Sequence, residues 1–245
     1  MSGTSYTPEE FSTNYPPGMH NYYWTHARNR ILLRELRKEG LSGRKFLEIG
    51  CATGLVVSYL RQHGLQVWGA ESGDPVVLDG AEGFIFTRQD CLDLPAEFRK
   101  SIEVVMLLDV IEHLEDPAGF LKSVAEAYPN AGHMILSVPS RSELWSSYDV
   151  EYRHFRRYDF QKMRETVAPL PYRLHKMNYL FTLLYLPAWI AAMTSGKRNH
   201  VVRPPLTRGA IRIHRLLSWW LYMDYLVIPG AVWGSSILAV LKRGQ

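Results

Sequence analysis

The residues with the clearest chemical meaning lie in the run Phe46-Leu-Glu-Ile-Gly-Cys-Ala-Thr-Gly54. Its apolar first half predicts a buried strand, and Gly50 and Gly54 predict a tight turn after it. The apolar stretch 55–63 predicts a helix, which Gly64 ends. Such a turn lets the backbone approach a ligand closely, and the start of the helix presents unpaired backbone N–H groups. The run therefore predicts a ligand-binding turn between a strand and a helix.

The spacing of the small residues distinguishes this turn from a dinucleotide fingerprint, which is G-x-G-x-x-G. Here Leu55 stands where the third glycine of that fingerprint would fall. The pattern from Glu48 to Gly54 is E-x-G-x-A-x-G, which resembles the first motif of class I S-adenosylmethionine (AdoMet) methyltransferases. Ala52 occupies a position where glycine is commoner in that family. The resemblance implies that the cofactor is bound by Glu48, Gly50, Cys51, Ala52 and Gly54.

The resemblance also implies a second strand that ends, about 20 residues further on, in an acid that binds the ribose hydroxyls. The stretch 66–70 fits such a strand, Glu71 is the acid, and Ser72 follows it at the cofactor. A carboxylate suits a ribose diol because its two oxygens can accept both O–H groups.

Two further strands extend the resemblance. Strand 84–90 ends at Asp90 and Cys91, which the family pattern implies to lie near the adenine. Strand 104–108 ends near the methyl group, so Leu108 and Asp109 complete the implied cofactor contacts. The run Asp109-Val-Ile-Glu-His-Leu-Glu-Asp-Pro117 resembles a segment of the branch that contains ubiquinone-type O-methyltransferases. Four motifs in order favour an AdoMet-binding domain over an ordinary βαβ domain with chance matches.

Length and composition bound the remaining choices. The 245 residues suit one α/β domain with a large insertion, or one domain with a small cap. Cys51 and Cys91 are the only cysteines, which argues against a disulfide framework and for a reducing compartment. We see no secretory signal or myristoylation motif. A cytoplasmic protein is therefore expected.

Charge is unevenly distributed along the chain. The window 166–223 contains eight Lys and Arg residues and no Asp or Glu, whereas the whole chain carries only +4, so the rest is net −4. The asymmetry indicates that the C-terminal third faces something anionic. The basic residues of the window are Arg173, Lys176, Lys197, Arg198, Arg203, Arg208, Arg212 and Arg215.

The order of the predicted elements divides the chain into four parts. Residues 1–40 comprise an irregular arm and a helix, which closes the cofactor site in similar proteins or simply packs on the sheet. Residues 41–177 form the AdoMet-binding core, residues 178–230 an apolar and basic insertion, and residues 231–245 the last strand of the core.

Within the core, alternating strands and helices indicate a mostly parallel sheet. The fifth and sixth strands are expected at 133–138 and 172–177, and the seventh, at 233–241, runs antiparallel in the resembling family. We therefore predict an α/β, Rossmann-like seven-stranded sheet with helices on both faces and a helical cap between strands six and seven. The long polar and aromatic segment 140–159 is expected to be a functional loop, and its end resembles the acceptor-lining segment of related enzymes.

The insertion begins with about 20 uncharged residues, a length that would span a bilayer. A single span would separate the seventh strand from its sheet, and a membrane hairpin would place Asp224 in lipid, which is costly. We favour a helical cap, either alone or also in contact with an anionic membrane surface. The adjacent Trp219 and Trp220 and the surplus of basic residues suit the second alternative.

The chemistry implied by the resemblance is in-line transfer of a methyl group from a sulfonium, in which positioning supplies much of the rate. A hydroxyl acceptor needs a base, and histidine suits this role near neutral pH. His113, after the fourth strand, and His154, in the acceptor loop, are the candidate catalytic residues; either could instead have a structural role. Tyr152, Arg153, Arg156 and Arg157 either receive an anionic acceptor or form a solvated basic loop.

A divalent metal is the alternative to a histidine base. Asp109, Glu112 and His113, with His154 later, resemble the acid, acid, His and distant His pattern of plant small-RNA terminal 2′-O-methyltransferases. An ion held there could bind two acceptor hydroxyls and lower their pKa. We favour the site without a metal.

Taken together, these features predict an AdoMet-dependent methyltransferase that releases S-adenosylhomocysteine and acts on oxygen of a lipid-linked or saccharide acceptor. One alternative is a methyltransferase for a small soluble metabolite, and another is a non-catalytic binding module with the same fold. The interleaved apolar runs argue against nucleic acid as partner. Peripheral contact with the inner face of a membrane is a further expectation.

Overall fold

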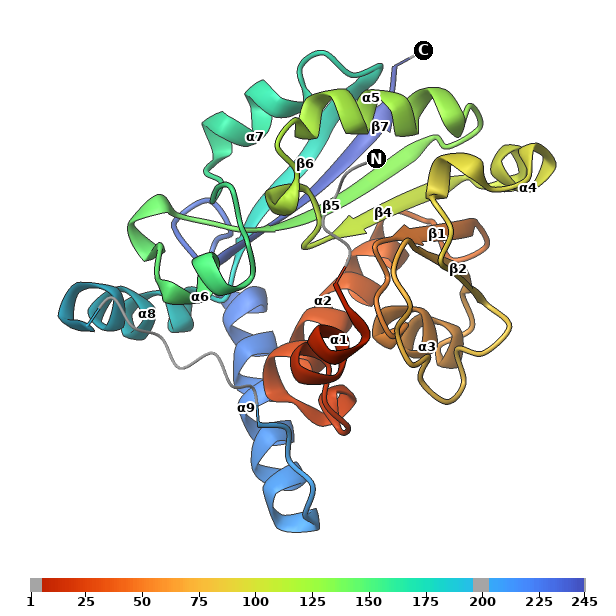
Figure 1. Ribbon diagram of the computed structural model, residues 1–245. Helices are drawn as coiled ribbons and strands as arrows, with labels where there is room; N and C mark the ends of the chain where they lie inside the picture. Colours follow the sequence, from red (N-terminus) through yellow and green to blue (C-terminus); the bar gives the residue numbers. More distant parts are fainter. Residues whose placement is uncertain (1–5, 196–202, 245) are drawn as a thin grey trace.

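A twisted sheet of seven strands forms the centre of the computed structural model, which describes residues 6–195 and 203–244 (Figure 1). The strand order is β3-β2-β1-β4-β5-β7-β6, and only β7 runs antiparallel to its neighbours, which are β5 and β6. This topology confirms the predicted fold class. The strands are β1 (Lys45–Ile49), β2 (Gln66–Glu71), β3 (Ile85–Thr87), β4 (Val104–Leu108), β5 (His133–Pro139), β6 (Tyr172–Leu180) and β7 (Ser236–Arg243).

Helices cover both faces of the sheet, so the central strands β1 and β4 are almost entirely buried rather than alternating between buried and exposed residues. One face packs against α4 (Ala96–Ser101), α5 (Pro117–Ala127) and α7 (Phe160–Val167), and its core includes Tyr128 and Tyr158. The other packs against α2 (Tyr23–Lys38), α3 (Leu55–Gln62) and α9 (Arg208–Val227). Two hydrophobic cores, one per face, hold the layers together.

The N-terminal arm differs from the prediction. The arm, residues 1–20, was expected to be irregular, but α1 (Pro8–Asn14) lies within it and a 3₁₀ turn, Met19–Asn21, overlaps its end; residues 1–5 are outside the described part. A capping box between Thr7 and Glu10, with proline at the first helical position, stabilises α1 locally. Phe11 anchors the helix because its ring is almost fully buried.

The segment 140–159 is also more ordered than the predicted loop. It contains a 3₁₀ turn, η4 (Ser142–Leu144), and α6 (Ser147–Glu151), which a second capping box between Ser146 and Asp149 begins. Strand boundaries differ as well, because β3 has only three residues and β6 continues to Leu180.

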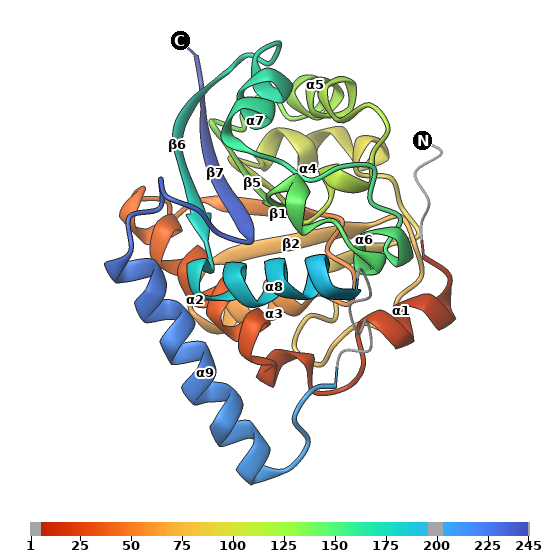
Figure 2. The same ribbon diagram turned by 90° about the vertical axis from the view of Figure 1, so that its left-hand side faces the viewer.

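The insertion between β6 and β7 contains α8 (Thr182–Ser195) and α9, and the view in Figure 2 faces both. Helix α9 packs along α2 through the buried residues Ser218 and Leu221, and the Ser218 hydroxyl lies 2.8 Å from Nδ1 of His26. Lys197 and Arg198 of the basic window lie outside the described residues. Of the helices in the described ranges, none combines the length and apolar character needed to cross a membrane.

The turn after β1 gives a stability prediction. Gly54 and Gly64 both have positive φ, +82° and +87°, so alanine strains the backbone at either position. A Cβ at Gly54 would also lie 2.2 Å from Ile85 Cδ1 and 2.9 Å from Ala81 Cβ, whereas at Gly64 it meets no described atom within 4 Å. We expect Gly64→Ala to cost about 1 kcal/mol of unfolding free energy and Gly54→Ala about 1–3 kcal/mol more. Urea denaturation measures both; equal losses would show that the neighbours of Gly54 relax freely.

Candidate functional site

The predicted ligand-binding turn lies where β1 ends and α3 begins, at the carboxyl edge of the sheet. Gly50 has φ +72°, and a Cβ there would lie 2.7 Å from Val110 Cγ2, so the turn packs tightly under the segment after β4. Ala52 also has positive φ, +46°, a position for which glycine is better suited. Because the strand order reverses between β1 and β4, this edge is a topological switch point, where α/β sheets bind ligands.

Glu71 holds the turn in place. Its carboxylate accepts hydrogen bonds from the backbone N–H of Ala52 at 3.0 Å and of Gly73 at 2.9 Å. Ser72 Oγ lies 3.5 Å from the same carboxylate. A carboxylate has about four acceptor positions; the two backbone N–H groups take two, and the long contact with Ser72 takes a third that a ligand hydroxyl could displace. Glu71 therefore lies where the sequence placed it, but it also organises the protein's own backbone.

Glu48 lies beside this turn among three charged neighbours, Arg28, Glu71 and Asp109. Arg28 of α2 donates from Nη1 to Asp109 Oδ2 at 2.6 Å, and Ser137 Oγ donates to Asp109 Oδ1 at 3.1 Å. Burial raises the pKa of Glu48 to about 8; Arg28 opposes the shift, and the charges of Glu71 and Asp109 add to it. Oε2 of Glu48 accepts no hydrogen bond from any described residue. The group therefore contains three carboxyl groups and one guanidinium.

The other predicted cofactor residues have mainly packing or capping contacts. Asp90 Oδ1 accepts from the N–H of Leu92 at 2.9 Å and so caps the short turn Cys91–Asp93. Burial raises the pKa of both Cys51 and Cys91, so neither thiol is reactive near neutral pH. Cys51 fills space next to Gly69, where an added Cβ would lie 2.5 Å from its sulfur. Leu108 is buried at the end of β4.

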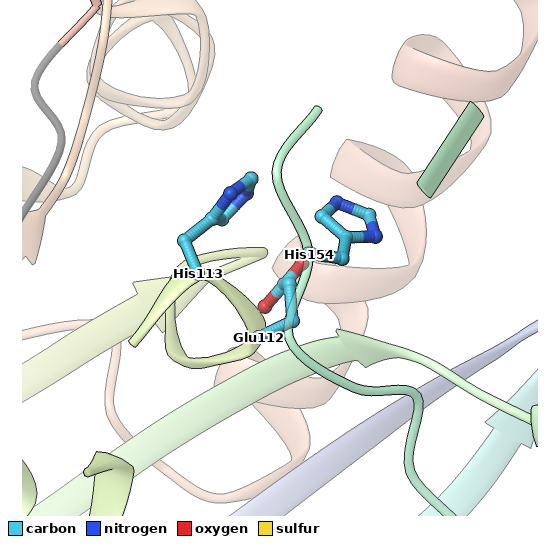
Figure 3. A group of neighbouring side chains, drawn as sticks. All are labelled: Glu112, His113 and His154. Carbon is cyan, nitrogen blue, oxygen red and sulfur yellow. The ribbon is translucent and has the colours of Figure 1, made fainter. Parts of the chain in front are cut away.

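The two candidate catalytic histidines lie together, although 41 positions separate them in the sequence. Figure 3 shows His113, from the 3₁₀ turn Ile111–His113 after β4, and His154, which follows α6, on either side of Glu112. The two imidazole centroids are 4.7 Å apart with the rings nearly perpendicular. One ligand-type atom from each of Glu112, His113 and His154 lies within 4.8 Å of the others.

Asp149 orients His154 from behind. Its Oδ1 lies 2.9 Å from His154 Nδ1 and accepts from Arg157 Nε at 2.7 Å, while its Oδ2 accepts from Arg157 Nη2 at 3.0 Å. Although burial alone would raise the pKa of Asp149, these partners hold it below the usual range. The contact engages Nδ1 of His154, so Nε2 is the nitrogen left to act on a ligand.

Burial shifts the pKa values of Glu112 and His113 in the directions that favour their uncharged forms. It raises the pKa of Glu112 well above the usual value, with Asp109 adding to the shift. Burial and the neighbouring His154 lower the pKa of His113 to about 4. Glu112 Oε2 is buried and receives no hydrogen bond from the residues that the structure describes. A buried carboxyl oxygen without a donor beside two imidazoles is the donor set that a divalent ion prefers.

The arginines of the acceptor loop already have partners within the chain, so the prediction that they receive an anionic acceptor loses its support. Arg157 is buried against Asp149, Arg156 donates to the backbone carbonyl of Glu115 at 2.7 Å, and Arg153 pairs with Glu10 of α1. The ring of Tyr152 packs on that of Tyr148, with 4.3 Å between centroids.

Helix α1 lies over both halves of the site. An added Cβ at Gly73 would lie 2.5 Å from the Phe11 ring, so the helix packs closely on the turn that Glu71 holds. Tyr6, just before α1, is 6.3 Å from the His113 ring. The Glu10–Arg153 pair joins α1 to the loop that carries His154.

Sequence reasoning missed Arg28, Asp149 and the contacts of α1. The capping pattern Ser146-x-x-Asp149 was a local signal for Asp149. Arg28 lies in a helix noted as a cover for the cofactor, but its partner Asp109 is 81 positions away.

Comparison with known proteins gives the family. A family model described as "Methyltransferase domain" matches residues 20–175. The ubiquinone biosynthesis O-methyltransferase of Proteus mirabilis is 25% identical over 114 residues, which cover 44% of this chain and 46% of that protein. The chain thus matches about half the length of these curated relatives.

Two solved structures show the same fold. Magnesium protoporphyrin IX methyltransferase from Synechocystis, with bound S-adenosylhomocysteine, has a TM-score of 0.53 at 14% identity, covering 91% of this chain and 86% of that one. Geranyl diphosphate C-methyltransferase from Streptomyces coelicolor has a TM-score of 0.53 at 15% identity, covering 89% and 79%. Because the family model covers more than half of its residues, the chain belongs to this methyltransferase domain family, with the Rossmann-like fold of class I AdoMet-dependent methyltransferases.

Proposed function

We propose that this methyltransferase binds AdoMet at the turn between β1 and α3 and transfers its methyl group to an oxygen atom of the acceptor. The observation that carries the proposal is the group of Glu48, Glu71 and Asp109 around the single guanidinium of Arg28. AdoMet carries a sulfonium and an ammonium, so it supplies the positive charge that this group lacks. The Synechocystis neighbour was crystallised with AdoMet as well as with S-adenosylhomocysteine, which supports the choice of ligand.

Each predicted cofactor residue then has a role. The remaining acceptor positions of Glu71 take the ribose hydroxyls, and the backbone from Gly50 to Gly54 lies along the methionine part. Ser72 follows Glu71 at the ribose, Asp90 and Cys91 lie after β3 beside the adenine, and Leu108 and Asp109 lie at the end of β4 near the methyl group.

His154 is the better candidate base of the two histidines. In the transfer, the bond from the methyl carbon to the acceptor oxygen forms as the carbon–sulfur bond breaks, and the hydroxyl proton passes to Nε2 of His154. Asp149 orients the ring and stabilises its protonated form, as an acid paired with a catalytic histidine does. The pKa of His113, about 4, is poorly matched to taking a proton near pH 7.

We propose an acceptor that is lipid-linked or saccharide-like. The exposed apolar residues of α8 and α9 beside the His154 loop and the ubiquinone-pathway name of the curated relatives support the lipid-linked class, together with peripheral contact with an anionic membrane. A small soluble hydroxyl compound is the alternative acceptor.

A divalent ion is a second way to activate the acceptor at the same place. The residues that fit it are Glu112, His113 and His154. Two imidazoles lie close together there, beside a buried Glu112 oxygen that has no described hydrogen-bond donor. A bound ion would lower the pKa of an acceptor hydroxyl.

AdoMet binding is the first test. Glu71→Gln removes the charge that receives the ribose hydroxyls, so we expect AdoMet affinity to fall about 10- to 100-fold by isothermal titration calorimetry. The matched control is Asp74→Asn, an exposed acid three positions away that pairs with Arg88, for which we expect no change. A folded wild-type protein that does not bind AdoMet would contradict the proposed function.

Binding of AdoMet should release protons. Glu48, with a pKa of about 8, is mostly protonated at pH 7, and a bound cation favours its ionised form. We expect AdoMet binding to release up to about one proton at pH 7 and fewer protons above pH 8. The number released is measured from the difference in binding enthalpy between phosphate and Tris buffers. Glu48→Gln should abolish the difference; equal wild-type enthalpies in both buffers would exclude this role for Glu48.

Metal titration separates the two ways of activating the acceptor. If an ion binds, Mn²⁺ or Mg²⁺ should titrate into the wild type, and Glu112→Gln should weaken binding at least about tenfold. Glu151→Gln, an exposed acid on the same loop, is the control and should bind as the wild type does. If the wild type binds neither ion, activation rests on His154 alone.

A further inference from the structure

We propose that α8 and α9 together form a docking surface, the α8–α9 face, which attaches the protein to the surface of an anionic lipid bilayer. This inference rests on the proposed function in one respect, because it makes the membrane the source from which a lipid-linked acceptor would reach the site.

Helix α8 exposes an apolar stripe. Leu183, Leu186, Ile190 and Met193 recur at spacings of three and four residues, and their exposed fractions are 51%, 57%, 48% and 67%. Residues at this spacing lie on one side of a helix. In a water-soluble helix such a stripe faces a protein core, whereas here it faces outward.

Helix α9 shows the same arrangement. Its buried side, with Ser218, Leu221 and Asp224, packs towards α2 and the core. The opposite side exposes apolar residues at intervals of three, four and seven positions. They are Ile213 at 62%, Leu216 at 57%, Trp220 at 54% and Val227 at 71%, and Trp219 is 43% exposed beside them. Helix α9 therefore buries one side and presents a second apolar side, whereas the described residues of α8 are all exposed or half-buried.

Charge decides which partner this face fits. Arg208, Arg212 and Arg215 of α9 are all exposed between the apolar residues, and the sequence from 166 to 223 contains no acid to oppose them. Basic residues next to an anionic leaflet are attracted to its negative surface potential. Tryptophan rings suit the boundary between headgroups and acyl chains. Over its described residues, neither helix is long and apolar enough to cross a membrane. The combination of apolar side chains, indole rings and arginines is typical of a helix that lies in the plane of the membrane interface.

The α8–α9 face is fixed to the loop that carries His154. The Tyr185 hydroxyl of α8 donates to Glu143 Oε1 in η4 at 3.0 Å, and Thr182 Oγ1 donates to the carbonyl of Trp233 at 2.8 Å. Asp224 of α9 is buried near the start of α8, and the nearby backbone N–H groups of Leu183 and Thr182 partly offset the rise that burial causes in its pKa.

The arrangement in space agrees with these contacts. Figures 1 and 2 show α8 next to the segment that includes α6, while α9 extends beyond the body of the protein. A bilayer against the α8–α9 face would therefore lie close to the acceptor side of the site.

Vesicle sedimentation tests the proposal. The chain of residues 1–245 is mixed at low salt with phosphatidylcholine vesicles, with and without phosphatidylglycerol. We expect sedimentation with the anionic vesicles only, and a loss of at least about tenfold in affinity for the double variant Leu186→Glu, Trp220→Glu. The control is Val76→Glu, an 86% exposed apolar residue outside the face, which should bind as the wild type does. The double variant Arg212→Gln, Arg215→Gln should bind the anionic vesicles more weakly, and its binding should depend less on salt concentration.

Two outcomes would overturn the proposal. One is a wild-type protein that stays in the supernatant with anionic vesicles at low salt. The other is a concentration-dependent dimer in sedimentation velocity that the double variant abolishes, because the face would then bind a second copy. AdoMet affinity, measured on every variant, shows that the site is folded. Failure of vesicle binding with intact AdoMet binding would leave the proposed function in place.

Discussion

The parallel alignment of β2, β1, β4 and β5 is the constraint on which the site depends. It brings the turn 50–54, the Glu71 carboxylate and the segment from Asp109 to His113 to one edge of the sheet. Both faces must be covered for such a sheet to be stable, so the edge is the place left for a ligand. Arg28 reaches the same edge from α2, and Asp149 fixes the one site loop, around His154, that the strands do not position.

The edge contains more acid than the protein itself neutralises. Glu48 and Glu112 are buried, and each has an oxygen without a described donor. Because the folded-state pKa of Glu48 is raised, its burial costs stability that grows as pH rises from its ordinary range towards 8. Asp149 behaves in the opposite way, since its lowered pKa stabilises the fold at neutral pH and that contribution is lost on acidification. A cationic ligand would relieve the first cost without disturbing the second.

Local patterns predicted the fold well, and long-range contacts explain most of what they missed. The glycine turn, Glu71 and the order of seven strands follow from hydrophobic runs and turn residues. Helix α1 escaped notice because the Pro and Ser content of residues 1–20 outweighed the Thr7–Glu10 cap. The loop arginines were expected either to receive an anionic acceptor or to be solvated, but Arg153 and Arg157 have partners that the sequence alone does not identify. A helical insertion was expected from composition, whereas which side of α9 would be exposed depended on its packing along α2.

The place of β7 has a consequence for how the protein is made. This strand hydrogen-bonds to β5 on one side and to β6 on the other, yet it is the last of the seven to leave the ribosome. Until it arrives, β5 and β6 both have an unpaired edge, and the apolar insertion is already synthesised. Exposed edges and apolar helices are what chaperones bind and what aggregates form from. The nascent chain therefore completes its sheet only after translation of 236–243, and its yield in a cell depends on protection during that interval.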